Sequence, residues 1–171
     1  QYVEKAGRLG AVLDPACVLT SAIALADHLS LRYPAGTLVL VVGMDGLRSA
    51  LSHKGFALTE DPDLAAIVVA GIDTSLTYDA LAKAVQALLA GAAFFGTNPD
   101  MLFPAEGVFK PGAGAILAAL SAASGKKPEV VGKPAAPLFL SALKRLALKP
   151  SQVAMIGDRQ DTDILGAAQV G

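Results

Sequence analysis

The 171-residue sequence has no tryptophan, a single cysteine and only two histidines. One cysteine excludes an internal disulfide framework and a cysteine-rich zinc site, and it fits a reducing compartment such as the cytoplasm. We expect Cys17 to be a buried filler residue. His28 and His53 provide little material for a histidine-based zinc site or a Ser-His-Asp triad.

Charged residues are also scarce, at 17% of the chain, and they nearly cancel to a formal net charge of -1. Because there is no basic stripe, the sequence predicts no nucleic-acid partner. Polar residues and glycines interrupt every apolar run before it reaches the roughly 20 residues of a membrane span. We therefore expect no membrane partner and a cytoplasmic protein.

The dominant pattern is an alternation of short β-rich runs with helical runs rich in alanine and leucine. The pairs are TLVLVVG with LRSALSHKG, AAIVVAG with TYDALAKAVQALLAG, AAFFGTN with GAGAILAALSAASG, EVVG with PLFLSALKRLAL, and QVAMIGD with DTDILGAAQ. Such alternation is typical of a parallel sheet with crossover helices, so the predicted fold class is α/β. Gly55, Gly91 and Gly125 follow helical runs and fit left-handed helix ends.

Two linker-like stretches divide the chain. They are RYPAGT at 32–37 and SGKKPE at 124–129, and they bracket three of the strand-helix units. This arrangement indicates an inserted lobe. We predict one α/β domain over residues 34–129 and a second part made of residues 1–33 and 130–171.

Three aspartates cluster in the stretch MIGDRQDTDIL near the end of the sequence. Asp158 follows an expected strand, and ligands of parallel sheets lie at the carboxyl ends of strands. Since Mg²⁺ prefers oxygen ligands and keeps several waters, Asp158 is a predicted metal ligand. Asp161 is expected to belong to the start of the following helix. Asp163 has two interpretations, as a supporting residue behind the metal site or as a helix-start carboxylate.

Lys133 follows the expected strand EVVG at the same kind of strand end. Its ammonium group could bind a phosphate or a carboxylate, although a lone lysine is also common on a solvated surface. The stretch GTNPDMLFP at 96–104 fits either substrate contact or a turn, with Asn98 and Asp100 as its candidate residues. The stretch FKPGAGAIL lacks the third glycine of a dinucleotide fingerprint, and its glycines indicate a tight turn.

In this order and spacing, the motifs GTNPD, PGAGAI, EVVGKPAAPLF and VAMIGDRQDTDILGA resemble the haloacid dehalogenase (HAD) superfamily. They are similar to the branch of p-nitrophenyl phosphatases, phosphoglycolate phosphatases, NagD-like nucleotidases and pyridoxal phosphate phosphatase. The resemblance implies a partial Rossmann-like parallel-sheet core over residues 1–33 and 130–171. It also implies an inserted α/β cap domain over residues 34–129.

The same resemblance implies a phosphatase that hydrolyses monoesters of a small phosphorylated metabolite through an aspartyl-phosphate, with Mg²⁺ as cofactor. It implies that Lys133 steadies the nucleophile and the phosphate, that Asp158 binds Mg²⁺, and that Asp163 supports this site. The stretch NPDMLFP resembles the specificity loop of the family. Asn98 and Phe103 are therefore the expected substrate contacts, and an apolar Phe103 favours packing over recognition of an extra charge.

The family's nucleophile motif, Asp-x-Asp-Gly, is missing from this sequence. The Asp-x-Asp pairs that do occur, at 61–63 and 161–163, do not follow an apolar strand with the required Gly-Thr behind it. We therefore expect a catalytically inactive fragment whose nucleophile lies upstream. One alternative is a non-catalytic phosphate-binding or interaction protein that kept the fold, and a nucleotide-binding module that uses PGAGAI ranks last. Unpaired strand edges in a partial core would allow a homodimer.

Overall fold

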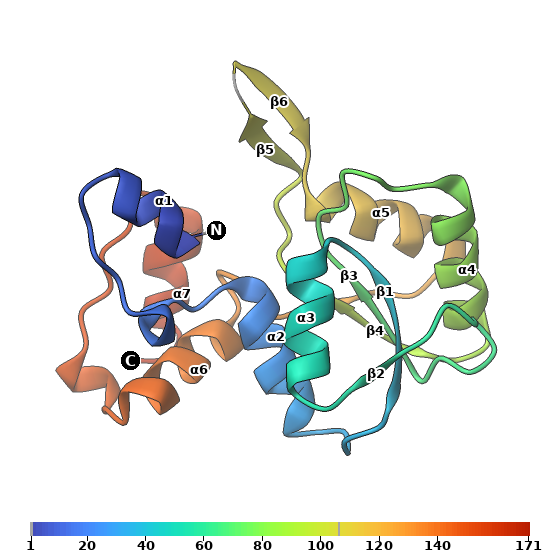
Figure 1. Cartoon of the computed structure of the whole chain (residues 1–171), viewed down its shortest axis with the longest axis horizontal. Coiled ribbons are helices and arrows are strands. Elements are labelled where there is room, and N and C mark those ends of the chain that lie inside the picture. Colours follow the sequence, from blue (N-terminus) through green and yellow to red (C-terminus); the bar gives the residue numbers. More distant parts are fainter. Residues whose placement is uncertain (1, 106) are drawn as a thin grey trace.

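Parallel strands form the centre of the molecule in the structure, a computed structural model that describes residues 2–105 and 107–171. Within these residues they make a five-stranded sheet of order β2-β1-β3-β4-β7 (Figure 1). The bounds are Leu38–Val42 (β1), Ala57–Leu58 (β2), Ile67–Ala70 (β3), Ala93–Gly96 (β4) and Glu129–Val130 (β7). Every neighbouring pair is parallel, and the register places Val39 opposite Ile67. The predicted α/β class is confirmed.

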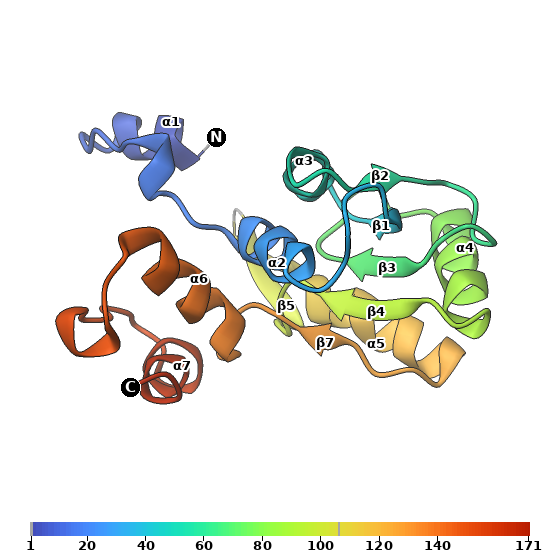
Figure 2. The same ribbon diagram turned by 90° about the horizontal axis from the view of Figure 1, so that it is seen from below.

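Helices cover both faces of the sheet (Figure 2). They are α2 (Ser21–Ser30) and α3 (Asp45–His53) on one face, and α4 (Tyr78–Leu89) and α5 (Ala113–Ser124) on the other. Successive side chains of a strand point to opposite faces. Val41 therefore packs with α2 and α3, while Val42 packs with α4 and α5. Burial on both faces explains why β1 is an unbroken apolar run.

Local signals set the ends of these helices. The Thr20 hydroxyl accepts the N–H of Ile23 at 3.2 Å at the start of α2, and Thr77 accepts the N–H of Ala80 at 3.1 Å at the start of α4. Such caps satisfy N–H groups that have no partner inside the helix. Gly125 ends α5 with a φ of 70°, as the sequence predicts.

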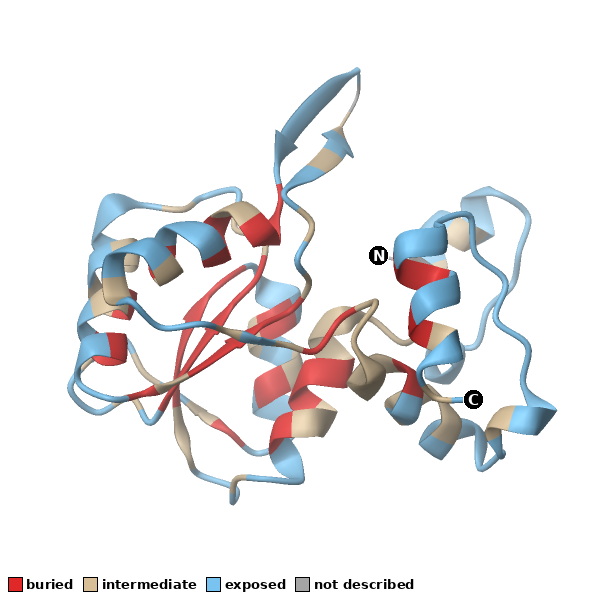
Figure 3. Ribbon diagram, turned by 180° about the vertical axis from the view of Figure 1, so that it is seen from behind, coloured by how far each residue is buried: buried red, intermediate tan, exposed pale blue. Residues whose placement is uncertain are grey.

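The remaining helices lie beside the sheet unit, with α2 between the two parts (Figures 1 and 2). They are α1 (Tyr2–Arg8), η1 (Pro15–Cys17), α6 (Ala136–Leu146), η2 (Pro150–Gln152), η3 (Gln160–Ile164) and α7 (Leu165–Ala168). Helix α2 contacts α3 on one side and α6 on the other. Burial is concentrated in the sheet unit, while the part that holds both termini is mostly exposed (Figure 3). The division into residues 34–129 and the flanking segments stays a prediction.

Three local expectations were wrong. The expected strand at 152–158 is not formed, because strands need neighbours for their backbone hydrogen bonds and no described strand lies beside this segment. The stretch after Asp100 contains an antiparallel hairpin of β5 (Leu102–Ala105) and β6 (Val108–Pro111) where a loop was expected. Cys17 is exposed in the short helix η1, which has no buried residue, so it is not a core residue.

Helices in residues 2–105 and 107–171 are all too short or too polar to cross a membrane.

Candidate functional site

Two neighbouring strand ends form the floor of the candidate site. Strand β4 leads into Thr97 and Asn98, and β7 leads through Gly132 into Lys133. Because the strands are parallel and adjacent, both ends lie at the same edge of the sheet. Gly132 allows them to touch, since a Cβ there would overlap the carbonyl oxygen of Thr97. The sequence-predicted residues Asn98 and Lys133 therefore share one edge.

Lys133 forms an ion pair with a buried carboxylate. Its Nζ donates to Asp163 Oδ1 at 2.5 Å, and the side chain of Asp163 is 4% exposed while that of Lys133 is 40% exposed. The backbone N–H of Arg159 donates to the other oxygen of Asp163 at 3.3 Å. The hydrogen bond from Lys133 lowers the pKa of Asp163, although burial alone would raise it. Asp163 is thus an ionised carboxylate that holds the lysine in place.

Asp158 is placed by a tight turn. Gly157 precedes it, and a Cβ at Gly157 would overlap the side chain of Asp163, so only glycine lets the chain pass so close. Asp158 itself is exposed. Among the residues that the structure describes, its carboxylate has no hydrogen-bond or ion-pair partner. It is the carboxylate of this turn that remains available to a ligand.

These residues fit part of a magnesium site. In the described part of the chain, no group of three or more acidic, histidine or cysteine side chains is placed to hold a metal ion. Asp163 is committed to Lys133, which leaves Asp158 as a free oxygen donor. Mg²⁺ keeps several waters and accepts one or two carboxylates together with phosphate oxygens. Asp158 can therefore serve as one oxygen ligand of Mg²⁺, and the described residues do not complete a magnesium site around it.

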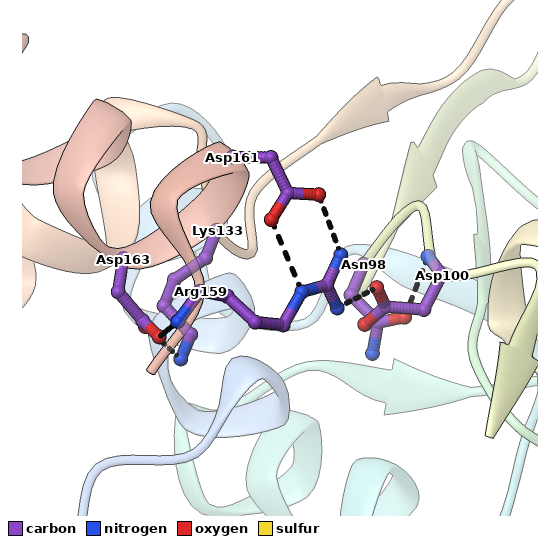
Figure 4. Close-up of polar contacts among 6 residues, drawn as sticks. All are labelled: Asn98, Asp100, Lys133, Arg159, Asp161 and Asp163. Carbon is purple, nitrogen blue, oxygen red and sulfur yellow. Dashed lines mark hydrogen bonds and ion pairs between the residues drawn. The ribbon is translucent and has the colours of Figure 1, made fainter. Parts of the chain in front are cut away.

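Arg159 connects this turn to the loop after β4 (Figure 4). Its Nε and Nη2 donate to the two oxygens of Asp161 at 3.2 and 2.8 Å, and its Nη1 donates to Asp100 Oδ1 at 2.8 Å. The two carboxylates raise the pKa of Arg159, with Asp161 as the larger cause, and Arg159 lowers the pKa of Asp161. Asp161 lies in the first turn of η3, as expected. Arg159 was not among the predicted site residues, because its only signal in the sequence was its position between predicted site aspartates.

The two remaining candidates, Asn98 and Phe103, lie in the loop after β4 and in the hairpin that follows it. Asn98 is half-buried, and its Oδ1 accepts the N–H of Asp100 at 3.3 Å, so it helps to shape the loop. Phe103 is half-buried on β5, opposite Lys110 of β6, in the hairpin that projects from the sheet unit (Figure 1). The strand ends thus bring Lys133 and Asn98 to one edge, where Asp163 of η3 pairs with Lys133, while Phe103 lies on the neighbouring hairpin.

Comparison with known proteins identifies the family. Residues 9–171 match the model of the haloacid dehalogenase-like hydrolases, and the chain belongs to this family. An acid sugar phosphatase of Staphylococcus epidermidis is 39% identical over 171 residues, which is 100% of this chain and 65% of that relative. The chain therefore spans about 65% of the length of the curated relatives that it matches.

Solved structures agree with the sequence comparison. A double mutant of a thermostable NPPase from Geobacillus stearothermophilus superposes with a TM-score of 0.95 at 34% identity, covering 100% of this chain and 68% of that one. A glycerol phosphate phosphatase from Mycobacterium tuberculosis in complex with magnesium gives a TM-score of 0.90 at 32% identity, covering 99% and 51%. These relatives are phosphatases of the NagD-like type, which confirms the branch indicated by the motifs.

Proposed function

We propose that this chain forms part of a Mg²⁺-dependent phosphatase that hydrolyses phosphate monoesters through an aspartyl-phosphate. The observation that supports the proposal is the unpartnered Asp158 carboxylate on the turn that also holds the Lys133–Asp163 ion pair. The lysine ammonium group can bind the anionic phosphate ester, and the free carboxylate on the adjacent segment can bind the metal ion. Membership of the HAD-like hydrolases gives this arrangement its chemical context.

Each residue has a proposed role. Lys133 uses one of its three donors on Asp163, so its other N–H groups can bind a phosphate oxygen and the nucleophile. Asp163 orients that lysine, and Asp158 is the proposed ligand of Mg²⁺, which when bound would neutralise phosphate charge. Asn98 and Phe103 are proposed as substrate contacts.

The proposed nucleophile lies outside residues 1–171, because the sequence has no aspartate in the required motif. In this scheme residues 34–129 form the cap, residues 1–33 and 130–171 belong to the catalytic core, and the chain alone is inactive. A cytoplasmic location fits the single cysteine. A homodimer formed through strand edges stays a prediction, which sedimentation of the purified chain would test.

Small phosphorylated metabolites are the proposed substrates. The staphylococcal relatives are acid sugar phosphatases, and the mycobacterial neighbour is a glycerol phosphate phosphatase. Sugar phosphates and glycerol phosphate are therefore the first esters to test, together with p-nitrophenyl phosphate as a general reporter.

The test is to restore the upstream segment of the protein and to assay these esters with Mg²⁺ and with a chelator. We expect Mg²⁺-dependent hydrolysis, and a loss of at least about 100-fold in kcat for Lys133→Ala and Asp158→Ala, as for other groups that stabilise charge in a transition state. Lys83→Ala removes an exposed ion pair on α4 and is the matched control with full activity.

A folded, extended protein that hydrolyses none of these esters would refute the phosphatase proposal. If that protein nevertheless bound inorganic phosphate in a calorimetric titration, the non-catalytic binding protein would be the better description.

A further inference from the structure

Arg159 holds together two segments that lie 59 positions apart in the sequence. Its Nε and Nη2 form a two-pronged contact with Asp161, which belongs to the same turn. This contact fixes the plane of the guanidinium, because the fork of an arginine matches the two oxygens of a carboxylate. The remaining Nη1 donates across to Asp100, in the loop that leads into β5 (Figure 4).

The Asp100 end of this link is attached to the base of the hairpin. The carbonyl oxygen of Asp100 accepts the N–H of Gly114 at 2.9 Å, and the N–H of Gly112 donates to Met101 O at 2.8 Å. A Cβ at Gly112 would overlap the Asp100 carbonyl oxygen, and one at Gly114 would overlap that of Pro99. The loop is therefore packed directly on the start of α5. Any shift of Asp100 shifts the base of the β5–β6 hairpin with it.

The Arg159 end is attached to the ion pair of the candidate site. The Arg159 N–H donates to Asp163 Oδ2 at 3.3 Å, and its carbonyl oxygen accepts the N–H of Asp163 at 2.8 Å. Asp163 in turn holds Lys133, and Gly132 packs against Thr97, three residues before Asp100. These contacts form a closed ring that includes the ends of β4 and β7, the loop that contains Asp100 and the turn that contains Arg159. Asp158 directly precedes Arg159 in the same turn.

We propose that Arg159 is a positioning residue that fixes the β5–β6 hairpin relative to Lys133 and Asp158 and thereby determines which phosphate esters fit the site. This role in specificity rests on the proposed phosphatase function, whereas the physical link between the turn and the hairpin does not. The side chains of Arg159 and Asp100 are 49% and 39% exposed, so their ion pair adds little to global stability. Its proposed effect is on the position of the β5–β6 hairpin.

The first test measures the link in residues 1–171. Hydrogen exchange of the hairpin amides at 102, 103, 105 and 107–110 is compared between the wild type, Arg159→Ala and Arg159→Lys. We expect Arg159→Ala to accelerate hairpin exchange at least about threefold while the strands β1, β3 and β4 are unchanged, because the loss is a local opening. Arg159→Lys keeps the charge without the planar fork and should restore part of the protection.

Two further variants make this result specific. Asp100→Asn removes the carboxylate charge and so weakens the same contact from the other side, and it should also accelerate hairpin exchange, even if Arg159→Ala fails to fold. Lys83→Ala removes another solvent-accessible ion pair, on α4 at 2.9 Å to Asp79, and should leave hairpin exchange unchanged. Unchanged hairpin exchange in both Arg159→Ala and Asp100→Asn would overturn the link.

The second test measures specificity in the protein with its upstream segment restored. Arg159→Ala should raise KM for sugar phosphates at least about fivefold while their kcat changes less than about twofold, which is the signature of lost substrate binding contacts. An active enzyme whose KM values are unaffected would overturn the specificity role. If the wild type is inactive, the proposed function fails, and hydrogen exchange alone decides whether Arg159 links the two segments.

Discussion

Solvent exposure differs sharply between the two partners of the ion pair at the candidate site. Asp163 is almost fully buried, whereas Lys133 is 40% exposed. A buried carboxylate that loses its cation keeps the cost of desolvation without the compensating attraction. The stability of this turn therefore depends on Lys133, even though lysine is the more solvated partner.

Lys133→Ala should lower the free energy of unfolding by about 2 kcal/mol, less than the roughly 3 to 5 kcal/mol of fully buried pairs because water screens the exposed ammonium. Asp158→Ala is the matched control from the same turn. Since Asp158 is exposed and makes no described contact, it should change stability by less than about 0.5 kcal/mol. Urea denaturation measures both changes in the free energy of unfolding. Equal changes in the two variants would contradict the role of Lys133 in stabilising this turn.

Asp27 gives a second prediction, on the pH dependence of stability. Its carboxylate accepts from Lys54 at 2.6 Å, Ser141 at 2.7 Å and Arg145 at 3.0 Å. Burial raises the pKa of Asp27, but these three donors together outweigh burial and hold it below the usual value. A carboxylate with a lowered pKa in the folded state stabilises the protein above its unfolded pKa, about 3.9, and loses that effect as the pH falls through the folded value.

Asp27→Asn should therefore be less stable than the wild type by about 1 to 2 kcal/mol at pH 5 to 7, and the difference should shrink below about pH 4. Urea denaturation over this pH range is the measurement. Asp79→Asn removes a carboxylate from an exposed pair on α4 and should have little effect throughout. A difference that stayed constant or grew on acidification would show that the charge of Asp27 is not what stabilises the network.

At this scale, the sequence identified Lys133 and Asp158 because both follow an expected strand end. It could not identify the contact between Arg159 and Asp100, since no local pattern marks two residues 59 positions apart. The pairing of Asp163 with Lys133 depends equally on tertiary packing. Cys17 was misjudged because apolar residue type alone predicts burial, whereas η1 packs on too little of the chain to bury it.

At the scale of helices, two glycines show whether close packing outweighs the preference of helices for alanine over glycine. Gly46 lies in α3 and a Cβ there would meet nothing within 4 Å, so Gly46→Ala should stabilise the protein by about 0.5 kcal/mol. Gly166 lies in α7, where a Cβ would overlap the ring of Phe139 on α6 and lie 2.9 Å from the Pro134 carbonyl oxygen. Gly166→Ala should destabilise it by about 1 to 3 kcal/mol.

Thermal or urea unfolding of the two variants gives the answer, because the expected effects have opposite signs. Stabilisation by both alanines would mean that α6 and α7 do not pack as closely as the structure has them. Destabilisation by both would show that Gly46 has a contact or conformation that the structure does not contain.

The elements that the sequence predicted best are those whose pattern is local. Strand β1 has an apolar run that is explained by burial on both faces, and α4 follows a threonine cap. The β5–β6 hairpin was missed because Pro104 and Pro111 are poor strand residues and most of its side chains are exposed. The segment 152–158 was predicted as a strand and does not form one. Its residues favour β structure, but a strand needs a neighbouring strand to pair with.

Across the whole molecule, burial is uneven. The largest buried side chains belong mostly to the sheet and to the helices that face it (Figure 3). From residue 130 onward, Val131 and Phe139 are the buried apolar side chains of the described chain, while Ile156 is 93% exposed. The sheet unit thus has a continuous core on both faces, and the C-terminal segment is held by fewer apolar contacts.

We expect this difference to appear as different local stabilities. Amides of β1, β3 and β4 should exchange at least about tenfold more slowly than those of α6 and α7, because segments with few buried contacts open more easily. Hydrogen exchange of the isolated chain measures this directly. Equal protection of residues 130–171 and of the sheet would contradict the prediction and would also weaken the proposed division into domains.

The three-donor network at Asp27 also has a consequence for how the protein is made. Ser141 and Arg145 lie 114 and 118 positions after Asp27. The strands β1, β3, β4 and β7 and their helices are therefore synthesised before these two partners, whereas Lys54 follows Asp27 closely. Since nascent chains fold as units from the N-terminal side, we expect the sheet to assemble with Asp27 paired first to Lys54. Helix α6 then completes the network once Ser141 and Arg145 have been synthesised.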